Sequence, residues 1–123
     1  RKAQQCATRL AKRFGDDRIT ATTDLAGALA GAQGLINATP TGMTGHPGLP
    51  VPANLVRGDL WVSDVVYFPL ETELVRLARA QGCRVVPGGG MAVFQAVGGA
   101  FEYFTGRRPD PDRMLRHFEE LTR

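Results

Sequence analysis

Amphipathic helical patterns alternate with short apolar runs along the whole chain, and this alternation restricts its fold more than any other feature. In the helical stretches apolar residues recur at steps of three and four, whereas the short runs between them are rich in β-branched residues. Such alternation is typical of an α/β domain whose parallel sheet is covered by helices on both faces. With 123 residues, 43% of them hydrophobic, the chain is long enough for one such domain and too short for two of ordinary size.

Spacing and capping signals predict five helices. They cover residues 2–14, 25–32, 70–81, the stretch that follows Gly90, and residues from 111 onward. Gly15, Gly34 and Gly82 are the stop signals of the first three helices, and Asp110-Pro111-Asp112 is a strong start signal for the last. The residues expected in the core are Trp61, the phenylalanines and, on the last helix, Met114, Leu115, Phe118 and Leu121.

Four short strands are predicted, at residues 18–22, 35–37, 60–67 and 84–86. Residues 38–58 carry four prolines and four glycines, so we expect a long loop without regular structure. Loops of that length in compact domains are usually functional or disordered. No Gly-x-Gly-x-x-Gly turn, which normally opens a dinucleotide-binding unit, precedes the first helix.

Three loops with unusual chemistry leave the ends of predicted strands, at residues 37–43, 64–69 and 87–91. Ligands of parallel sheets bind beyond the carboxyl ends of the strands, so we expect these loops to converge on one crevice. In the third loop Gly88, Gly89 and Gly90 predict a bare turn. The turn is either a plain connection to a core helix or a place where a ligand approaches the backbone, and the glycines alone leave both interpretations open.

Charge and cysteine content argue against several other classes of protein. The formal charge is +3, but the arginines are spread along the chain, which does not indicate a nucleic-acid partner. Cys6 and Cys83 stand alone, so neither a metal site nor a disulfide framework is predicted. No apolar run approaches the roughly twenty residues that cross a bilayer, and we expect a cytoplasmic protein without a membrane partner. The start at Arg1, already inside a helical pattern, suggests a piece of a longer protein.

Three motifs, in this order and spacing, resemble the shikimate dehydrogenase family. They are Asn37-Ala38-Thr39-Pro40-Thr41-Gly42-Met43, then Asp64-Val65-Val66-Tyr67-Phe68-Pro69-Leu70-Glu71-Thr72, then Gly88-x-x-Met91-x-x-x-Gln95-Ala96. Val65-Val66-Tyr67 with Glu71-Thr72-Glu73-Leu74 looks most like the quinate/shikimate dehydrogenase branch. The resemblance covers essentially all 123 residues.

This resemblance implies an oxidoreductase with an N-terminal substrate domain and a nicotinamide-binding Rossmann domain. Residues 1–123 match most of the latter: an incomplete doubly wound parallel sheet with a C-terminal helical extension, without the substrate domain and the glycine-rich first βα turn. It also implies hydride transfer between NAD or NADP, with NAD favoured, and shikimate or quinate, in the shikimate pathway or in quinate catabolism. A homodimer through the missing domain is a further expectation.

The resemblance and the chemistry of the side chains together imply a set of site residues. A nicotinamide needs a close-fitting apolar wall, and a polyhydroxylated ring acid needs groups that donate and accept hydrogen bonds. The expected cofactor contacts are Lys2, on the adenosine side, and Thr39, Pro40, Thr41, Gly42, Met43, Val65, Gly88 and Met91. The expected substrate contacts are Tyr67 and Gln95.

Several residues keep a second interpretation. The proton-transfer lysine and aspartate of the family lie in its substrate domain and have no match here, so no catalytic residue is predicted in this chain and the chain alone should be inactive. Asp64 either ties down a neighbouring loop or takes part in catalysis, with the first favoured. His46 is expected to be a bystander, His117 a solvated or packing residue, and the pair Arg107-Arg108 a solvated turn. The alternative function is a dinucleotide-binding module without turnover.

Overall fold

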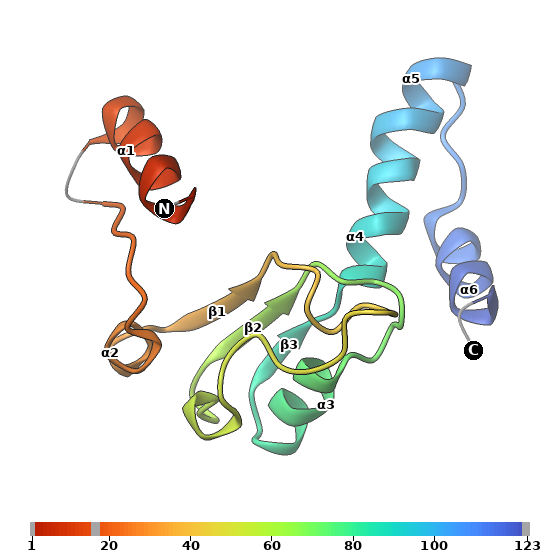
Figure 1. Ribbon diagram of the computed structural model, residues 1–123. Helices are drawn as coiled ribbons and strands as arrows, with labels where there is room; N and C mark the ends of the chain where they lie inside the picture. Colours follow the sequence, from red (N-terminus) through yellow and green to blue (C-terminus); the bar gives the residue numbers. More distant parts are fainter. Residues whose placement is uncertain (1, 16–17, 122–123) are drawn as a thin grey trace. The chain divides into compact units, whose positions relative to one another are not determined.

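The computed structural model describes residues 2–15 and 18–121 (Figure 1). The chain divides into two compact units, Arg1–Ala32 and Gln33–Arg123. Within the described residues no helix is both long enough and apolar enough to span a membrane.

The first unit contains two helices, α1 (Lys2–Phe14) and α2 (Leu25–Ala30). Both were predicted, although α2 ends at Ala30 and its cap is Gly31, earlier than expected. Asp24 caps the start of α2, because its Oδ1 accepts a hydrogen bond of 2.9 Å from the backbone N–H of Gly27. The predicted strand at residues 18–22 is wrong, since a strand needs hydrogen bonds from a neighbour and no described strand pairs with this run.

The second unit is built on a parallel sheet of three strands, β1 (Gly34–Asn37), β2 (Trp61–Asp64) and β3 (Arg84–Val86), with β2 in the middle. The α/β fold class is therefore confirmed. β2 is shorter than predicted because its last residue interrupts the ladder: the backbone N–H of Val66 donates to the Asp64 side chain at 3.0 Å instead of to a strand.

The two faces of this sheet differ in their cover. Val62 is fully buried, and α3 (Glu73–Ala80) packs on β2 and β3 through Leu74, Val75 and Ala78. The opposite face carries Ile36 and Val86, which are 58% and 60% exposed. Within this unit, helices therefore cover one face of the sheet.

Two connections differ from the prediction. α3 begins at Glu73 and leaves Leu70 outside, because Thr72 is its cap: Oγ1 of Thr72 accepts the backbone N–H of Val75 at 3.2 Å. The long loop at residues 38–58 contains a 3-10 turn, η1 (Ala53–Leu55). The buried side chains of Val51 and Val56 flank this turn, so regular structure forms where a loop alone was expected.

The helix after β3 is one continuous arm made of α4 (Gly88–Phe94), the π-helix η2 (Gln95–Phe101) and α5 (Glu102–Thr105) (Figure 1). The predicted bare turn at the glycines is wrong, because Pro87 is the cap and the helix already begins at Gly88. A Cβ atom at Gly88 would lie 2.5 Å from the carbonyl oxygen of Val66. Glycine therefore lets α4 start directly against the loop after β2.

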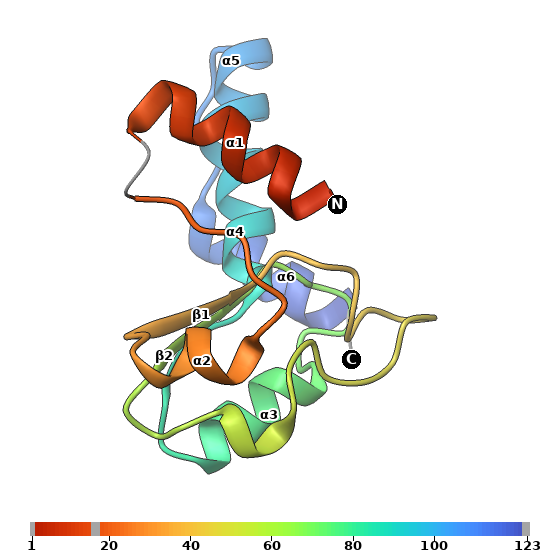
Figure 2. The ribbon, with the colours of Figure 1, turned by 60° about the vertical axis from the view of Figure 1, so that its left-hand side comes forward.

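The last helix, α6 (Pro111–Leu121), folds back and packs against α4 (Figure 2). Oδ1 of Asp110 caps it, as predicted, by accepting the backbone N–H groups of Asp112 and Arg113 at 3.0 and 3.1 Å. Leu121 is 70% exposed, and the other three apolar residues expected to be buried on α6 are only half-buried.

The aromatic residues are mostly outside the core, contrary to the prediction. Within the second unit the arm of α4, η2 and α5 extends away from the sheet, and α6 packs against α4, so several apolar side chains of the arm remain exposed (Figures 1 and 2). The exposed aromatic members of the expected core are Phe14, Trp61, Phe68, Phe94, Phe101 and Phe104.

Candidate functional site

The three loops that leave the carboxyl ends of the strands lie next to one another. The backbone N–H of Thr44, in the loop after β1, donates to the carbonyl oxygen of Phe68, in the loop after β2, at 3.1 Å. Gly88, after β3, is buried against the carbonyl oxygens of Val65 and Val66. The predicted convergence of the three loops is thus confirmed.

Asp64, at the end of β2, is buried and serves as an acceptor for three groups. Its Oδ1 accepts from Nδ2 of Asn37 and from the backbone N–H of Val66, each at 3.0 Å, and its Oδ2 accepts from Oγ1 of Thr72 at 2.6 Å. A carboxylate buried to 1% exposure is stable only with such partners. These contacts belong to a side chain that ties loops together, the interpretation favoured from the sequence.

Asn37, at the end of β1, is equally buried and uses its whole amide. Nδ2 donates to Asp64 and, at 3.0 Å, to the carbonyl oxygen of Thr41. Oδ1 accepts from the backbone N–H and the hydroxyl of Thr39, at 3.1 and 2.7 Å. Exchanging the amide oxygen and nitrogen would set acceptor against acceptor, so the partners fix the orientation of the amide.

No separate role was predicted for Asn37 or Thr72, although both lie in the three motifs. The signal available was a polar residue at the end of each of two neighbouring buried strands. A buried polar side chain needs a hydrogen-bond partner, and for each of these two residues the other is the nearest candidate. In the described residues no buried side-chain nitrogen or oxygen lacks a hydrogen-bond partner.

The three glycines of α4 have different surroundings. A Cβ atom would clash with backbone at Gly88 and would lie 2.6 Å from Cδ2 of Leu70 at Gly89, whereas at Gly90 it would meet no atom within 4 Å. Internal packing therefore accounts for the first two glycines. Gly90 is the one whose surroundings leave space at this edge of the sheet.

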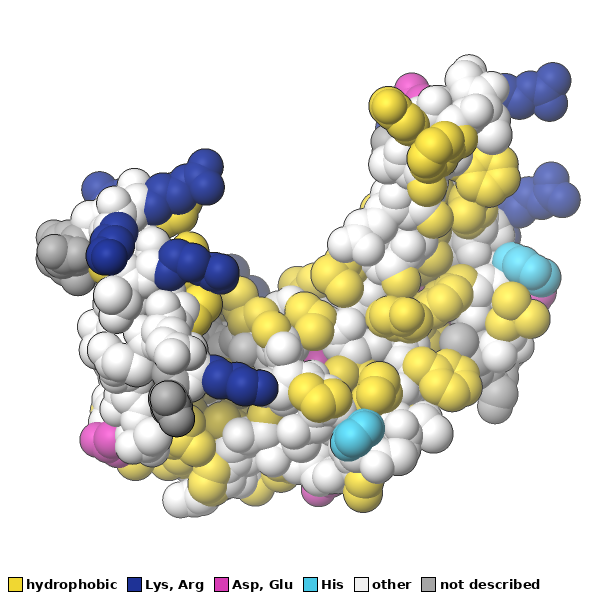
Figure 3. Space-filling model, turned by 45° about the horizontal axis from the view of Figure 1, so that its top comes forward, with side chains coloured by type: hydrophobic (Ala, Val, Ile, Leu, Met, Phe, Trp, Pro, Cys, Tyr) yellow, Lys and Arg dark blue, Asp and Glu magenta, His cyan; other side chains and the backbone are white. Residues whose placement is uncertain are grey.

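The remaining predicted site residues of the second unit lie mainly on the surface around the strand ends. Val65 is half-buried, while Met43, Tyr67, Met91 and Gln95 are exposed. Figure 3 turns the carboxyl ends of the strands toward the viewer and shows hydrophobic side chains gathered there and along the helical arm. An exposed apolar surface of this kind is suited to a flat ring such as a nicotinamide.

Tyr67 and Gln95 leave this edge from different elements. The Tyr67 ring packs on Phe118 of α6, with centroids 6.2 Å apart and a tilt of 51°. Gln95 opens the π-helix, and π-turns are frequent at functional sites. Lys2 lies on α1 in the first unit and is exposed there.

Two cavities border the loops. One of about 440 Å³ is lined by Gly42, Met43, Thr44, Gly45, Pro47, Gly48, Pro69, Glu71, Glu73 and Arg76. The other, of about 630 Å³, is lined by Leu70, Glu71, Arg79, Val86, Pro87, Gly89, Gly90, Leu115, Phe118 and Glu119. Glu71 borders both and forms an ion pair with Arg79. The loops after β1 and β3 thus each carry a hollow beside the residues expected to bind ligands.

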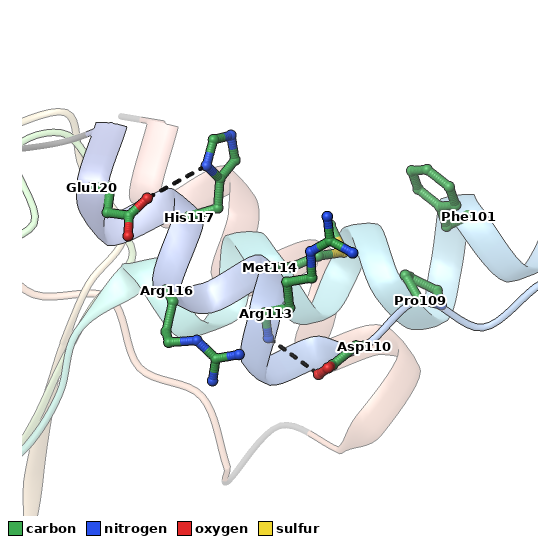
Figure 4. A pocket seen from close by; sticks show the side chains of 8 residues that line it. All are labelled: Phe101, Pro109, Asp110, Arg113, Met114, Arg116, His117 and Glu120. Atoms are coloured by element: carbon green, nitrogen blue, oxygen red, sulfur yellow. Dashed lines mark hydrogen bonds and ion pairs between the residues drawn. The ribbon is translucent and has the colours of Figure 1, made fainter.

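A third cavity, of about 550 Å³, lies between η2 and α6 (Figure 4). Its lining residues are Phe101, Pro109, Asp110, Arg113, Met114, Arg116, His117 and Glu120. No residue expected to bind cofactor or substrate is among them. Nδ1 of His117 lies 3.7 Å from Oε2 of Glu120, and both side chains are exposed, as expected for a solvated histidine.

The ionisable groups with displaced pKa values lie away from these loops. The hydrogen bond from Arg57 lowers the pKa of Asp59, and burial raises the pKa of Cys83, whose thiol donates to the carbonyl oxygen of Arg57 at 3.0 Å. Among the described residues, no group of three or more His, Cys, Asp or Glu side chains is placed to hold a metal ion.

Comparison with known proteins identifies relatives over nearly the whole chain. No family model matches it. The shikimate dehydrogenase (NADP(+)) of Streptomyces avermitilis is 54% identical over 122 residues, which are 98% of this chain and 42% of that protein. This chain is homologous to the shikimate dehydrogenases. The family resemblance in its three motifs is thereby confirmed.

Relatives that are named for quinate as well as shikimate are also similar to this chain. The quinate/shikimate dehydrogenase (NAD(+)) of Corynebacterium glutamicum is 50% identical over 93 residues, 76% of this chain and 32% of that protein. The solved structure of quinate dehydrogenase from Corynebacterium glutamicum in complex with NAD has a TM-score of 0.84 and 40% identity, covering 97% of this chain and 43% of its own. The chain thus spans less than half the length of the relatives it matches.

Proposed function

We propose that residues 1–123 are most of the NAD(P)-binding domain of a shikimate or quinate dehydrogenase. The parent enzyme transfers a hydride between a nicotinamide cofactor and the ring alcohol of shikimate or quinate, or the corresponding 3-dehydro ketone. The observation that carries this proposal is the meeting of three strand-end loops, which bring residues 39–43, 65–67 and 88–95 to one edge of a parallel sheet.

The proposed roles follow from the chemistry of each side chain. When bound, the nicotinamide supplies the carbon that accepts or donates the hydride. Met43, Val65 and Met91 would supply an apolar wall for its ring, and the backbone of residues 39–43 would line the cofactor. Gln95 and Tyr67 offer donors and acceptors to the hydroxyl groups of the substrate. Lys2 is assigned to the adenosine side.

Proton transfer is assigned to the substrate domain. The only lysines of this chain, Lys2 and Lys12, are on α1, and the family pattern places the acid–base lysine and aspartate in the other domain. The chain alone is therefore proposed to lack turnover. The parent is proposed to act in the cytoplasm as a homodimer, in aromatic amino-acid biosynthesis or quinate catabolism, and light scattering of the complete protein would test the dimer.

The choice of cofactor and substrate needs a direct assay, because the relatives include NADP-dependent and NAD-dependent enzymes. We favour NAD, since Val65-Val66-Tyr67 resembles the quinate/shikimate branch. The test is turnover of shikimate and of quinate by the complete protein, each with NAD and with NADP. Oxidation of at least one ring substrate is expected. Dinucleotide binding without turnover in all four combinations would instead favour a non-catalytic binding module.

A further inference from the structure

One buried oxygen atom connects two loops that are far apart in the sequence. Oδ1 of Asp64 accepts a hydrogen bond from the side chain of Asn37, 27 residues earlier, and another from the backbone of Val66, just after β2. The first bond reaches the loop expected to line the cofactor. The second fixes the start of residues 65–67, which are expected to reach the nicotinamide and the substrate.

The loop after β1 takes its shape from Asn37. Its amide holds Thr39 through two bonds and Thr41 through one, and the Thr39 hydroxyl in turn accepts the backbone N–H of Thr41 at 3.2 Å. Because Nδ2 of Asn37 also bonds to Asp64, a shift of Asp64 would be transmitted to this turn.

Thr72 attaches the start of α3 to the same carboxylate. Its hydroxyl donates to Oδ2 of Asp64 at 2.6 Å and accepts from the backbone N–H of Val75. Its methyl group faces the loop after β1, since a Cβ atom built on Gly42 would lie 3.5 Å from Cγ2 of Thr72. Thr72 therefore contacts the end of β2 through its hydroxyl and the loop after β1 through its methyl group.

We propose that Asn37, Asp64 and Thr72 form a positioning unit, the strand-end triad, which fixes the loop at residues 39–43 against residues 65–67 so that the cofactor can be held between them. This inference rests on the proposed function. Asp64 does not act on the substrate: it is 1% exposed, and both of its oxygens are engaged within the protein. The triad acts through the loops that it holds.

The test uses Thr72→Val and its matched control Thr72→Ser in the complete protein. Valine keeps the methyl group but leaves Asp64 Oδ2 without its donor, whereas serine keeps the hydroxyl. Below the Tm of every variant, we expect Thr72→Val to raise the Kd for the dinucleotide about three- to tenfold, with little change in the KM for the ring substrate. Thr72→Ser should remain close to the wild type.

Hydrogen–deuterium exchange separates this inference from the proposed function. The peptide that contains residues 39–43 should exchange faster in Thr72→Val than in Thr72→Ser, whatever reaction the enzyme catalyses. Asp64→Ala, which removes all three hydrogen bonds to the carboxyl group, should produce the same change. A lower Tm with unchanged exchange in this peptide and an unchanged dinucleotide Kd would overturn the triad. Absence of turnover in the wild type would contradict only the proposed function.

Discussion

Gly88 has no room for a side chain, because a Cβ atom there would lie 2.5 Å from the carbonyl oxygen of Val66. We expect Gly88→Ala to push α4 away from the loop after β2 and to lower the free energy of unfolding by on the order of 1–3 kcal/mol. Gly90→Ala is the matched control, since that position is helical and open, and it should stabilise by about 0.5–1 kcal/mol. Urea denaturation of the complete protein measures both, and equal effects would contradict this account.

The same geometry changes how a larger substitution at Gly88 is interpreted. Weaker cofactor binding in Gly88→Leu would follow from displacement of α4 as readily as from a lost contact with the nicotinamide. Cofactor titrations of Gly88 variants are therefore informative only when the unfolding curves of the same variants are also measured. Gly90 has open space around it and is the better position for testing how closely a ligand approaches the backbone.

Gln95 is exposed at the first turn of the π-helix, so its removal should leave the fold intact. We expect Gln95→Ala to raise the KM for the ring substrate about tenfold, the value of one good hydrogen bond, and to change the KM for the cofactor much less. Glu102→Ala, at another exposed position of the same arm, controls for general effects. Steady-state kinetics with each substrate varied in turn would measure the two KM values separately. Equal changes in both would contradict the assignment of Gln95 to the ring substrate.

At the level of single residues, the sequence predicts which loops meet at the site better than it predicts the contacts that hold those loops in place. The loops at residues 37–43, 64–69 and 87–91 could be selected because parallel topology brings strand ends together. The hydrogen bond between Asn37 and Asp64 could not be predicted, because it joins residues 27 apart whose pairing depends on strand order and register. Similarly, Gly88 and Gly89 look like an open turn until their neighbours are known.

Among the elements, those defined by local signals were predicted well. β1 and β3 appear where β-branched or apolar runs stand between turn signals, and the Asp110 cap places α6. The run at residues 18–22 failed because a strand depends on a partner that local sequence does not specify. The π-helix was not predicted either, since the stretch after Gly90 carries ordinary helical spacing and π-turns are rare.

α6 offers a test of how much a capping residue stabilises a helix that contacts a predicted site residue. The helix supports Tyr67 through Phe118, and its first turn depends on two hydrogen bonds to Asp110. Asp110→Ala should cost about 0.5–2 kcal/mol of helix stability, whereas Asp110→Asn should cost little because asparagine caps equally well. Hydrogen exchange along α6 would detect fraying in the alanine variant alone, and similar exchange in both would show that the cap is dispensable.

For the whole molecule, the prediction of core residues was the least successful part. Trp61 and most phenylalanines are exposed, because composition tells how much apolar surface a chain has and not what covers it. The chain also matches less than half the length of its relatives. Exposed apolar side chains are often places where another part of a protein, or a partner, packs.

The helical arm gives this idea a direct test. Tyr103 and Phe104 are 81% and 80% exposed on α5, with Phe94 and Phe101 also exposed on α4 and η2. We expect residues 1–123, expressed alone, to bind a hydrophobic dye and to self-associate, and the complete protein to do neither through this surface. Replacing Tyr103 and Phe104 by serine should reduce both effects, whereas Phe14→Ser, at an exposed aromatic on α1, serves as the control. Dye fluorescence and light scattering measure the outcome. A monomeric fragment without dye binding would mean that the arm needs no partner, because its aromatic side chains would then remain exposed to water without causing association.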